Sequence, residues 1–243
     1  MKYNIIQRSY ILLGCCIIFW SSSLQSQGQS LPVSKYGLEF INTLDIYHSM
    51  VAADTLQKMV NLQKKIPNIT LDLRYASTNN FMHRRMYPKH VTYTFMRMQA
   101  ANALLLIQND LNNQGLGLKI FDAYRPYSVT EKFWELVHDD RYVADPKKGS
   151  GHNRGIAVDL TLIDLKTGKE LQMPTGFDNF SDSAHHDFMQ LPDASLKNRA
   201  LLKSTMEKYG FIAFATEWWH YSLPDPEKYA VLDISFEALK KNK

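Results

Sequence analysis

Two histidines and one aspartate are the residues of this sequence best suited to chemistry. His152 and Asp159 lie seven residues apart in the segment SGHNRGIAVD, and His220 ends the later run EWWH. Two imidazoles and one carboxylate are a ligand set typical of catalytic Zn²⁺, where three protein ligands leave a fourth position for water. Seven residues are too many for one face of a helix, so we expect a loop that runs into a strand to turn both side chains inward.

Glu217 lies three residues before His220, close enough along the chain to reach that water without binding the metal itself. This is the usual position of a general base in a zinc hydrolase. A lone histidine is more often structural than a ligand, and the chain has eight histidines. The combination favours a metal site, because small residues surround the first pair and an acid accompanies the second histidine. Trp218 and Trp219 are interpreted as core or wall residues.

The motifs carry a resemblance to a known family. Residues 150–159 fit the pattern S-x-H-x-x-G-x-A-x-D, and residues 217–220 read Glu-Trp-Trp-His. Both resemble motifs of the zinc D-alanyl-D-alanine dipeptidases of the VanX type. Further blocks that resemble this family follow in its order: DLRYA at 72–76, DAYRP at 122–126, FD at 177–178 and SAHH at 183–186. The resemblance covers about residues 60 to 232, and several ordered motifs are far more specific than any single one.

The resemblance implies an activity and a set of site residues. The activity is zinc-dependent hydrolysis of D-Ala-D-Ala to free D-alanine, linked to cell-wall peptide metabolism or glycopeptide resistance. The implied roles are metal ligands His152, Asp159 and His220 for one Zn²⁺ per chain, general base Glu217, transition-state residue Arg125, and substrate-binding residues Asp178 and Ser150.

Two of these roles have plain alternatives. Arg125 is predicted where a strand leaves the sheet, a common place for a working residue, but a solvated surface arginine is equally consistent with its position. Ser150 is alternatively a hydroxyl that caps a loop. The resemblance puts neither His185 nor His186 on the metal, and both are interpreted as structural residues or as neighbours of the ligands.

The implied chemistry follows from charge. Zn²⁺ would lower the pKa of its water from about 15.7 towards 7, and Glu217 would take the proton and pass it to the leaving amine. Arg125 would help to stabilise the oxyanion. Asp178 would bind the substrate ammonium and so exclude longer chains, whose penultimate residue has an uncharged amide nitrogen.

Two other functions remain open from the sequence. A zinc D,D- or L,D-carboxypeptidase that trims peptidoglycan stem peptides would share the metal ligands but would need an open cleft, against which Asp178 argues. A non-catalytic zinc-binding module on the same scaffold would need neither Glu217 nor Arg125, because a structural zinc site is closed.

The elements that position these residues predict an α+β domain. We expect a mostly antiparallel sheet, with the metal residues on one face and helices on the other face and at the ends. The resemblance implies the zinc D,D-peptidase (Hedgehog/DD-peptidase-like) fold. Periodicity and turn signals predict strands at 69–75, 116–124, 155–163, 171–173, 211–215 and 217–223, and helices at 48–62, 95–112, 128–138 and 194–209, the third opened by a capping box of Ser128 and Glu131.

The first residues differ from the rest of the chain. Basic residues, an apolar run and a small polar stretch follow one another over residues 1–28, the order of a secretory signal peptide. Without the two basic residues of this segment, the formal charge falls from +4 to +2. Both cysteines lie there as well, so the mature chain would have no thiol, unless Cys15 is lipidated and anchors the protein to a membrane. We expect export to the periplasm.

The remaining chain is predicted to form one domain. A length of 243 residues with 45% hydrophobic and 21% charged residues is ordinary for a globular protein with a sizeable core. We predict a lead-in segment at 29–60 and a catalytic domain at 61–243. No basic stripe interleaved with aromatic residues suggests nucleic acid, so the expected partner is a small dipeptide. The sequence does not indicate an oligomeric state.

Overall fold

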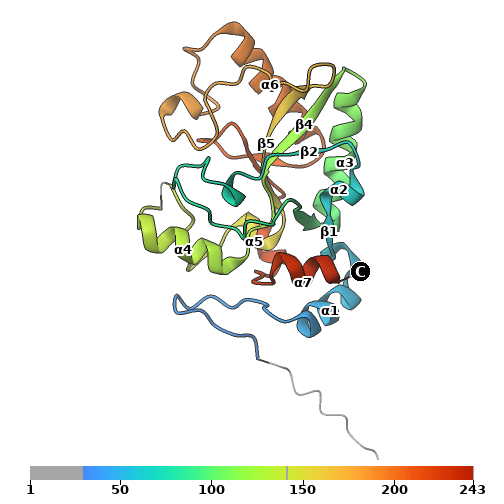
Figure 1. The fold of residues 1–243 in the computed structure, drawn as a ribbon, viewed down its shortest axis with the longest axis vertical. Coiled ribbons are helices and arrows are strands. Elements are labelled where there is room, and N and C mark those ends of the chain that lie inside the picture. The colour runs from blue at the N-terminus through green and yellow to red at the C-terminus, as the bar shows by residue number, and fades with distance from the viewer. Residues whose placement is uncertain (1–29, 141, 243) are drawn as a thin grey trace, which may run out of the picture. The chain divides into compact units, whose positions relative to one another are not determined.

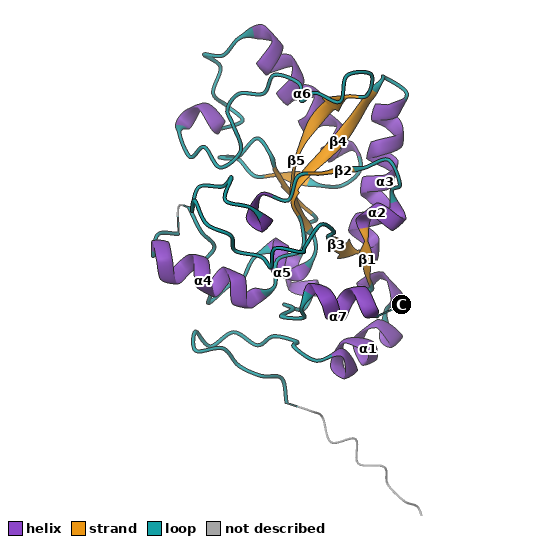
Figure 2. Ribbon diagram, in the orientation of Figure 1, coloured by secondary structure: helices purple, strands orange, loops and turns teal. Residues whose placement is uncertain are grey.

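A five-stranded sheet forms the centre of the fold (Figures 1 and 2). In spatial order its strands are β2 (Thr70–Leu71), β4 (Leu116–Asp122), β5 (Ala157–Asp164), β7 (His220–Ser222) and β6 (Ile212–Ala213). Only β2 and β4 are parallel, and the other three neighbouring pairs are antiparallel. The expected α+β architecture with a mostly antiparallel sheet is therefore confirmed. The computed structural model describes residues 30–140 and 142–242, so the predicted signal peptide at 1–28, with Cys15, lies outside the described residues.

One face of the sheet is covered by two long helices, α3 (Met98–Asn112) and α6 (Asp193–Lys208). Leu104 of α3 and Leu202 of α6 lie in one buried cluster with Val158 and Leu160 of β5. Neighbouring residues of a strand point to opposite faces. Asp159 must therefore face away from this cluster, towards the other side of the sheet.

A second buried cluster includes Ile41, Tyr47 and Met59 from the described part of the predicted lead-in segment. The remaining helices are α1 (Leu44–Ala53), α2 (Leu62–Lys65), α4 (Tyr127–Val137), α5 (Gly151–Arg154) and α7 (Phe236–Lys241). Strands β1 (Met59–Asn61) and β3 (Phe95–Arg97) pair into a separate antiparallel sheet, and short 3₁₀ helices occupy Thr55–Gln57, Arg74–Ala76, Asp182–Ala184 and Pro226–Lys228. No helix of the described residues is long and apolar enough to cross a membrane.

The side chain of Arg97, in β3, links four segments of the chain through hydrogen bonds. Its guanidinium is fully buried and donates hydrogen bonds to the carbonyl oxygens of Gln57, Arg154 and Ala230, at 2.6, 2.8 and 2.9 Å. Burial lowers the pKa of Arg97 to about 10. Because a buried cation is stable only when its donors are satisfied, these carbonyls fix where the lead-in, β3, α5 and the chain near Ala230 meet.

Several predicted boundaries are wrong because tertiary contacts override local patterns. The helix predicted for 95–112 begins at Met98, since Phe95–Arg97 pairs with β1. The helix predicted for 128–138 begins at Tyr127 without a capping box: Pro126 is its N-cap, and the backbone N–H of Ser128 donates to Asp233 instead. Tertiary hydrogen bonds from a distant side chain leave no sequence signal near the helix start.

The strand predictions are too long in the same way. The segment predicted as a strand at 217–223 is extended only at His220–Ser222, and Glu217 lies in the turn before it. The strand predicted for 69–75 shortens to Thr70–Leu71, followed by a 3₁₀ turn. The hairpin return predicted at 171–173 is reduced to one bridge between Ile163 and Glu170.

Candidate active site

The sheet register brings three acidic or imidazole side chains into one row. Asp122 of β4 lies directly opposite Asp159 of β5, and Asp159 lies directly opposite His220 of β7. Residues directly opposite one another in antiparallel strands share a face of the sheet. The row therefore lies on the face not covered by α3 and α6. Asp122 with Asp159, and Asp159 with His220, are each the terminal pair of their ladder.

His152 reaches the row from the short helix α5, which replaces the loop predicted for this segment. The Ser150 hydroxyl caps the helix by accepting from the backbone N–H of Asn153 at 3.2 Å. Gly155 ends it with φ of +72°, a backbone conformation that favours glycine, and a Cβ there would lie 2.7 Å from the Met59 sulfur. The small residues of the motif thus serve the close packing of α5 on its neighbours.

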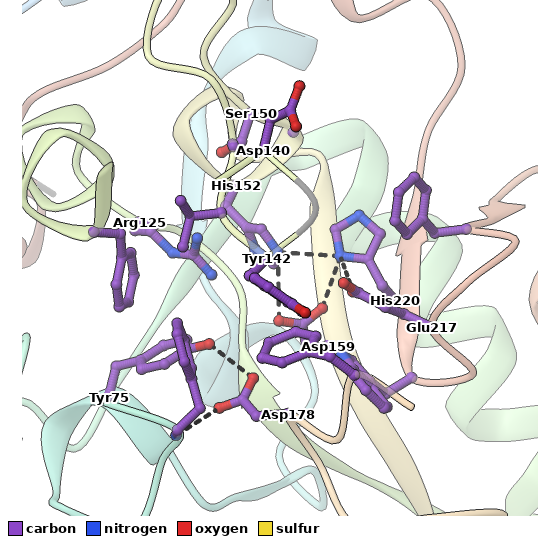
Figure 3. Close-up of a pocket in the computed structure, with 18 residues that line it drawn as sticks. Tyr75, Arg125, Asp140, Tyr142, Ser150, His152, Asp159, Asp178, Glu217 and His220 are labelled. Carbon is purple, nitrogen blue, oxygen red and sulfur yellow. Dashed lines mark hydrogen bonds and ion pairs between the residues drawn. The ribbon is translucent and has the colours of Figure 1, made fainter. Parts of the chain in front are cut away.

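The donor atoms of His152, Asp159 and His220 fit a metal ion. His152 Nε2 lies 3.3 Å from His220 Nδ1 and 3.4 Å from Asp159 Oδ2, and His220 Nδ1 lies 2.9 Å from Asp159 Oδ1 (Figure 3). Ligands about 2.0–2.2 Å from a tetrahedral zinc lie about 3.3–3.5 Å apart. His152 Nδ1 is 2.7 Å from the Ala123 carbonyl oxygen, the outer contact that orients a metal-binding imidazole. Among the described residues this is the one group with metal-ligand geometry.

The electrostatic surroundings keep the Asp159 carboxylate ionised, as a metal ligand must be. Burial alone would favour a neutral Asp159, which is 3% exposed, but the charge and hydrogen bonds of His152 and His220 hold its pKa well below the usual range. An ionised carboxylate between two imidazoles is the form that binds a divalent metal. The residues present therefore fit zinc.

Glu217 lies beside this group without joining it. Its Oε2 is 3.9 Å from His220 Nδ1, beyond hydrogen-bonding distance. Burial raises the pKa of Glu217, although the neighbouring His220 opposes the rise. Backbone hydrogen bonds on both sides fix the position of Glu217. Its N–H donates to the Phe214 carbonyl at 3.2 Å, and its carbonyl accepts from the His220 N–H at 3.2 Å. Glu217 is therefore placed to exchange a proton with a molecule held at the metal group.

Arg125 is buried and held by a carboxylate, so the alternative of a solvated surface arginine is wrong. Its Nε and Nη2 donate to Asp122 Oδ2 at 3.1 and 2.7 Å, and its guanidinium lies against the Tyr75 and Phe133 rings. Burial opposes its charge, but Asp122 together with Tyr87, Tyr75 and Asp159 outweighs burial, so the pKa of Arg125 is raised. The Tyr87 hydroxyl donates to the other oxygen of Asp122 at 2.6 Å, which fixes the carboxylate.

Asp178 lines the same cleft as the metal group and lies between Asp159 and Tyr75 in Figure 3. Its carboxylate accepts from the Tyr75 hydroxyl at 3.0 Å and from the Phe81 N–H at 3.4 Å. Burial raises the pKa of Asp178 to about 7, and repulsion from Asp159 adds to the rise, against the Tyr75 hydrogen bond. A partly buried carboxylate with a raised pKa gains most from a cation that arrives beside it.

Ser150 lines the same cleft, as a substrate-binding residue would, and its hydroxyl also caps α5. Its position is thus consistent with both the substrate-binding and the capping interpretation. The cleft has a volume of about 210 Å³, smaller than the roughly 300–1,000 Å³ of sites for drug-sized ligands. Aromatic rings form much of its wall: Tyr75, Phe81, Phe133, Tyr142, Phe180, Phe214 and Trp219. Its size suits a very small ligand.

Sequence reasoning assigned no role to three residues that shape the site. Asp122 lies in the DAYRP block and Tyr75 in the DLRYA block, so both were marked by a motif but given no role. Tyr87 lies outside every motif named above. Their importance comes from side-chain contacts between distant segments. His185 and His186 do not line the cleft, in agreement with their interpretation as residues off the metal.

Comparisons with known proteins identify the family. A family model described as "D-ala-D-ala dipeptidase" matches residues 55–238. A D-alanyl-D-alanine dipeptidase of Escherichia coli is 34% identical over 186 residues, which cover 76% of this chain and 94% of that protein. One of Enterococcus faecalis is 30% identical over 195 residues, covering 72% and 96%. A solved structure of the D,D-pentapeptidase VanY in complex with Zn(II) shares 14% identity over 55% of this chain and 75% of that chain, with a TM-score of 0.34.

The family match spans most of the described chain and includes every site residue discussed above. The relatives are matched over nearly their whole length. The chain therefore belongs to the D-Ala-D-Ala dipeptidase family: it is a metallopeptidase whose cofactor is zinc and whose reaction is the hydrolysis of D-Ala-D-Ala.

Proposed function

We propose that one small cleft performs this hydrolysis, with a metal group at one end and an ammonium-binding carboxylate at the other. The observation that carries the proposal is that Asp178 lines one small cleft together with His152, Asp159 and His220. The proposed roles are zinc ligands His152, Asp159 and His220, general acid-base Glu217, transition-state residue Arg125, and substrate-binding residues Asp178 and Ser150.

The proton transfers belong to Glu217. When bound, zinc supplies Lewis acidity, which makes a water acidic near neutral pH and polarises the scissile carbonyl. Glu217 takes a proton from the attacking water and returns it to the nitrogen of the leaving D-alanine. Burial raises the pKa of Glu217 above that of an ordinary glutamate, which is the direction that favours a group that must accept and then donate a proton.

Arg125 provides fixed positive charge for the oxyanion that forms on the scissile carbonyl. Its cation is held between Asp122 and two aromatic rings, so little reorganisation is needed when the negative charge develops. Asp122 is not expected to touch the substrate. It acts through Arg125, and we assign it a positioning role.

Asp178 explains the restriction to a dipeptide. A free α-ammonium can donate to this carboxylate and supply the missing countercharge, whereas an acylated nitrogen is neutral and carries additional bulk. The cleft volume of about 210 Å³ leaves little space for that bulk. Both features favour a dipeptidase over a carboxypeptidase that must accept a long stem peptide.

Steady-state kinetics test this function. The purified zinc-loaded protein is assayed with D-Ala-D-Ala, L-Ala-L-Ala and N-acetyl-D-Ala-D-Ala. We expect efficient cleavage of the first substrate and none of the third, since acetylation removes the ammonium. If the acetylated dipeptide is cleaved as readily as the free one, Asp178 is no ammonium site and the carboxypeptidase alternative becomes the better one.

We further propose that the protein works in the periplasm, after residues 1–28 are removed as a signal peptide. The support is the order of charged, apolar and small polar residues in that segment. Intact mass spectrometry of the protein from the cell envelope tests the proposal: a chain that begins near residue 29 supports it. A chain that begins at a lipidated Cys15 indicates a membrane anchor instead, and an unprocessed chain in the cytoplasm contradicts export.

The domain boundaries also remain a proposal, with a lead-in at 29–60 and the catalytic domain at 61–243. Ile41, Tyr47 and Met59 of the lead-in lie in the second buried cluster. We therefore expect removal of residues 29–60 to lower the thermal stability of the catalytic domain. An unchanged Tm after truncation would mean that this segment contributes nothing to the fold.

A further inference from the structure

A second groove is lined by residues of the two-stranded sheet, among them Met59, Val60 and Phe95. It has a volume of about 810 Å³ and shares no lining residue with the cleft. That volume is within the roughly 300–1,000 Å³ typical of small-molecule sites. The hydrolytic mechanism uses none of its residues.

Four lysines line this groove: Lys58, Lys64, Lys65 and Lys240. No aspartate or glutamate lines it, and none of the four takes part in an ion pair among residues 30–140 and 142–242. Glu237 of α7 acts electrostatically on Tyr93 in the groove, but its carboxylate pairs with His90. The groove therefore carries four ammonium groups and no carboxylate among its described lining residues.

The floor of the groove is apolar. Met59, Tyr93, Phe95 and Leu239 line the groove together with the lysines and are largely buried. Lys240 Nζ lies 4.3 Å from the centre of the Tyr93 ring, a cation–π contact that holds this ammonium over the floor. Polar side chains of Asn61, Gln63, Thr92 and Asn242 complete the wall. Such a surface offers several ammonium donors around an apolar base.

The lysines come from separate segments of the chain, so their grouping is not simply the charged face of one helix. Lys58 precedes β1, Lys64 and Lys65 end the four-residue helix α2, and Lys240 comes from α7 near the other end of the chain. Like charges that converge from distant segments repel one another. A concave wall of one sign also focuses the field and raises the local concentration of counterions. An anion would relieve this repulsion.

We propose that this groove binds a small molecule that carries a phosphate group and an apolar or aromatic part. Several ammonium groups match a group with more than one negative charge, and lysine binds phosphate as a point charge. The apolar floor would contact the remainder of the ligand. Because the two hollows share no residue, the ligand binds without displacing the dipeptide.

Isothermal titration calorimetry of the zinc-loaded full chain with phenyl phosphate tests the proposal. We expect saturable binding at one site per chain, with no inhibition of D-Ala-D-Ala hydrolysis. The triple variant Lys58→Gln, Lys64→Gln, Lys240→Gln should bind at least about tenfold more weakly, equivalent to roughly 1.4 kcal/mol. Its unchanged dipeptidase activity would report an intact fold.

A matched control separates a built site from general basicity. The variant Lys166→Gln, Lys169→Gln, Lys197→Gln removes the same charge from residues outside the groove and should bind phenyl phosphate as the wild type does. Equal weakening in both triple variants, absence of saturable binding, or competition with the dipeptide would each overturn the proposal. Groove-dependent binding to phosphatidylglycerol vesicles without binding to phenyl phosphate would also overturn it, because the surface would then be a membrane contact.

Discussion

The Asp122 carboxylate holds the Arg125 guanidinium through two hydrogen bonds to one oxygen, at 3.1 and 2.7 Å, while Tyr87 occupies its other oxygen. Asp122 is itself fully buried and lies directly opposite Asp159 in the sheet. The strand register that builds the metal group thus also fixes the arginine. The position of Arg125 depends on a residue that need not touch the substrate.

The first prediction follows from this arrangement. Asp122→Asn keeps the size of the side chain but removes the charge that orients Arg125, so kcat should fall by about ten- to a hundredfold, less than the roughly 10²–10³-fold loss typical when a transition-state donor is removed. KM should change little, and zinc content should stay that of the wild type. Steady-state kinetics and elemental analysis measure these quantities. A rise in KM with unchanged kcat would contradict a role through Arg125.

The second prediction concerns the base. Glu217→Gln should retain zinc, because Glu217 lies 3.9 Å from His220 Nδ1 and outside the ligand group. It should lose at least about 10²-fold in kcat, the usual scale of general acid-base catalysis. Glu207→Gln, on the exposed side of α6, is the matched control and should keep full activity. Activity of Glu217→Gln within about tenfold of the wild type would assign the proton transfer to another group.

The third prediction is a pH dependence of KM. Because burial raises the pKa of Asp178 to about 7, its ionised form, which binds the ammonium, becomes dominant as pH rises through that value. KM for D-Ala-D-Ala should therefore fall as pH rises to about 7, and rise again above about 8, where a free α-amine loses its proton. Asp178→Asn should abolish the fall on the acidic side. An acidic limb that persists in Asp178→Asn would belong to a different group.

The same shift has a consequence for stability. The folded pKa of Asp178 is above its ordinary value, so its contribution is most favourable at low pH and is lost as pH rises through about 7. An ammonium ligand would restore that loss by pairing with the carboxylate. This residue therefore costs stability in the free enzyme and recovers it when substrate binds.

The fourth prediction concerns the buried cation of Arg97. Arg97→Lys keeps the charge, but one ammonium cannot serve the three carbonyls that the guanidinium contacts. Buried groups left without partners cost about 1–3 kcal/mol, and more when charged, so the free energy of unfolding should fall by about 3 kcal/mol. Arg85→Lys is the control, because Arg85 donates to the Ala76 carbonyl from an exposed position. Equal urea midpoints for Arg97→Lys and wild type would contradict this account.

The sequence singled out three candidate ligands that the structure brings together, whereas it misjudged the bounds of several elements. His152, Asp159 and His220 are found together because ligand type and motif order are local signals, and the register that unites them follows from an antiparallel sheet. The helix that carries His152 was missed, because four residues are too few to show a period. The support of Arg125 by Asp122 and Tyr87 was also missed, since contacts between distant segments have no spacing in the sequence.

The most direct test of the account is the zinc content of the purified chain and of its His152→Ala, His220→Ala double variant. The three donor atoms lie within 4.8 Å of one another, and two of them come from these histidines. Elemental analysis should give about one zinc per wild-type chain and almost none in the double variant. Stoichiometric zinc in the double variant would contradict the assignment of the metal site, and with it the proposed roles of Glu217, Arg125 and Asp178 around that site.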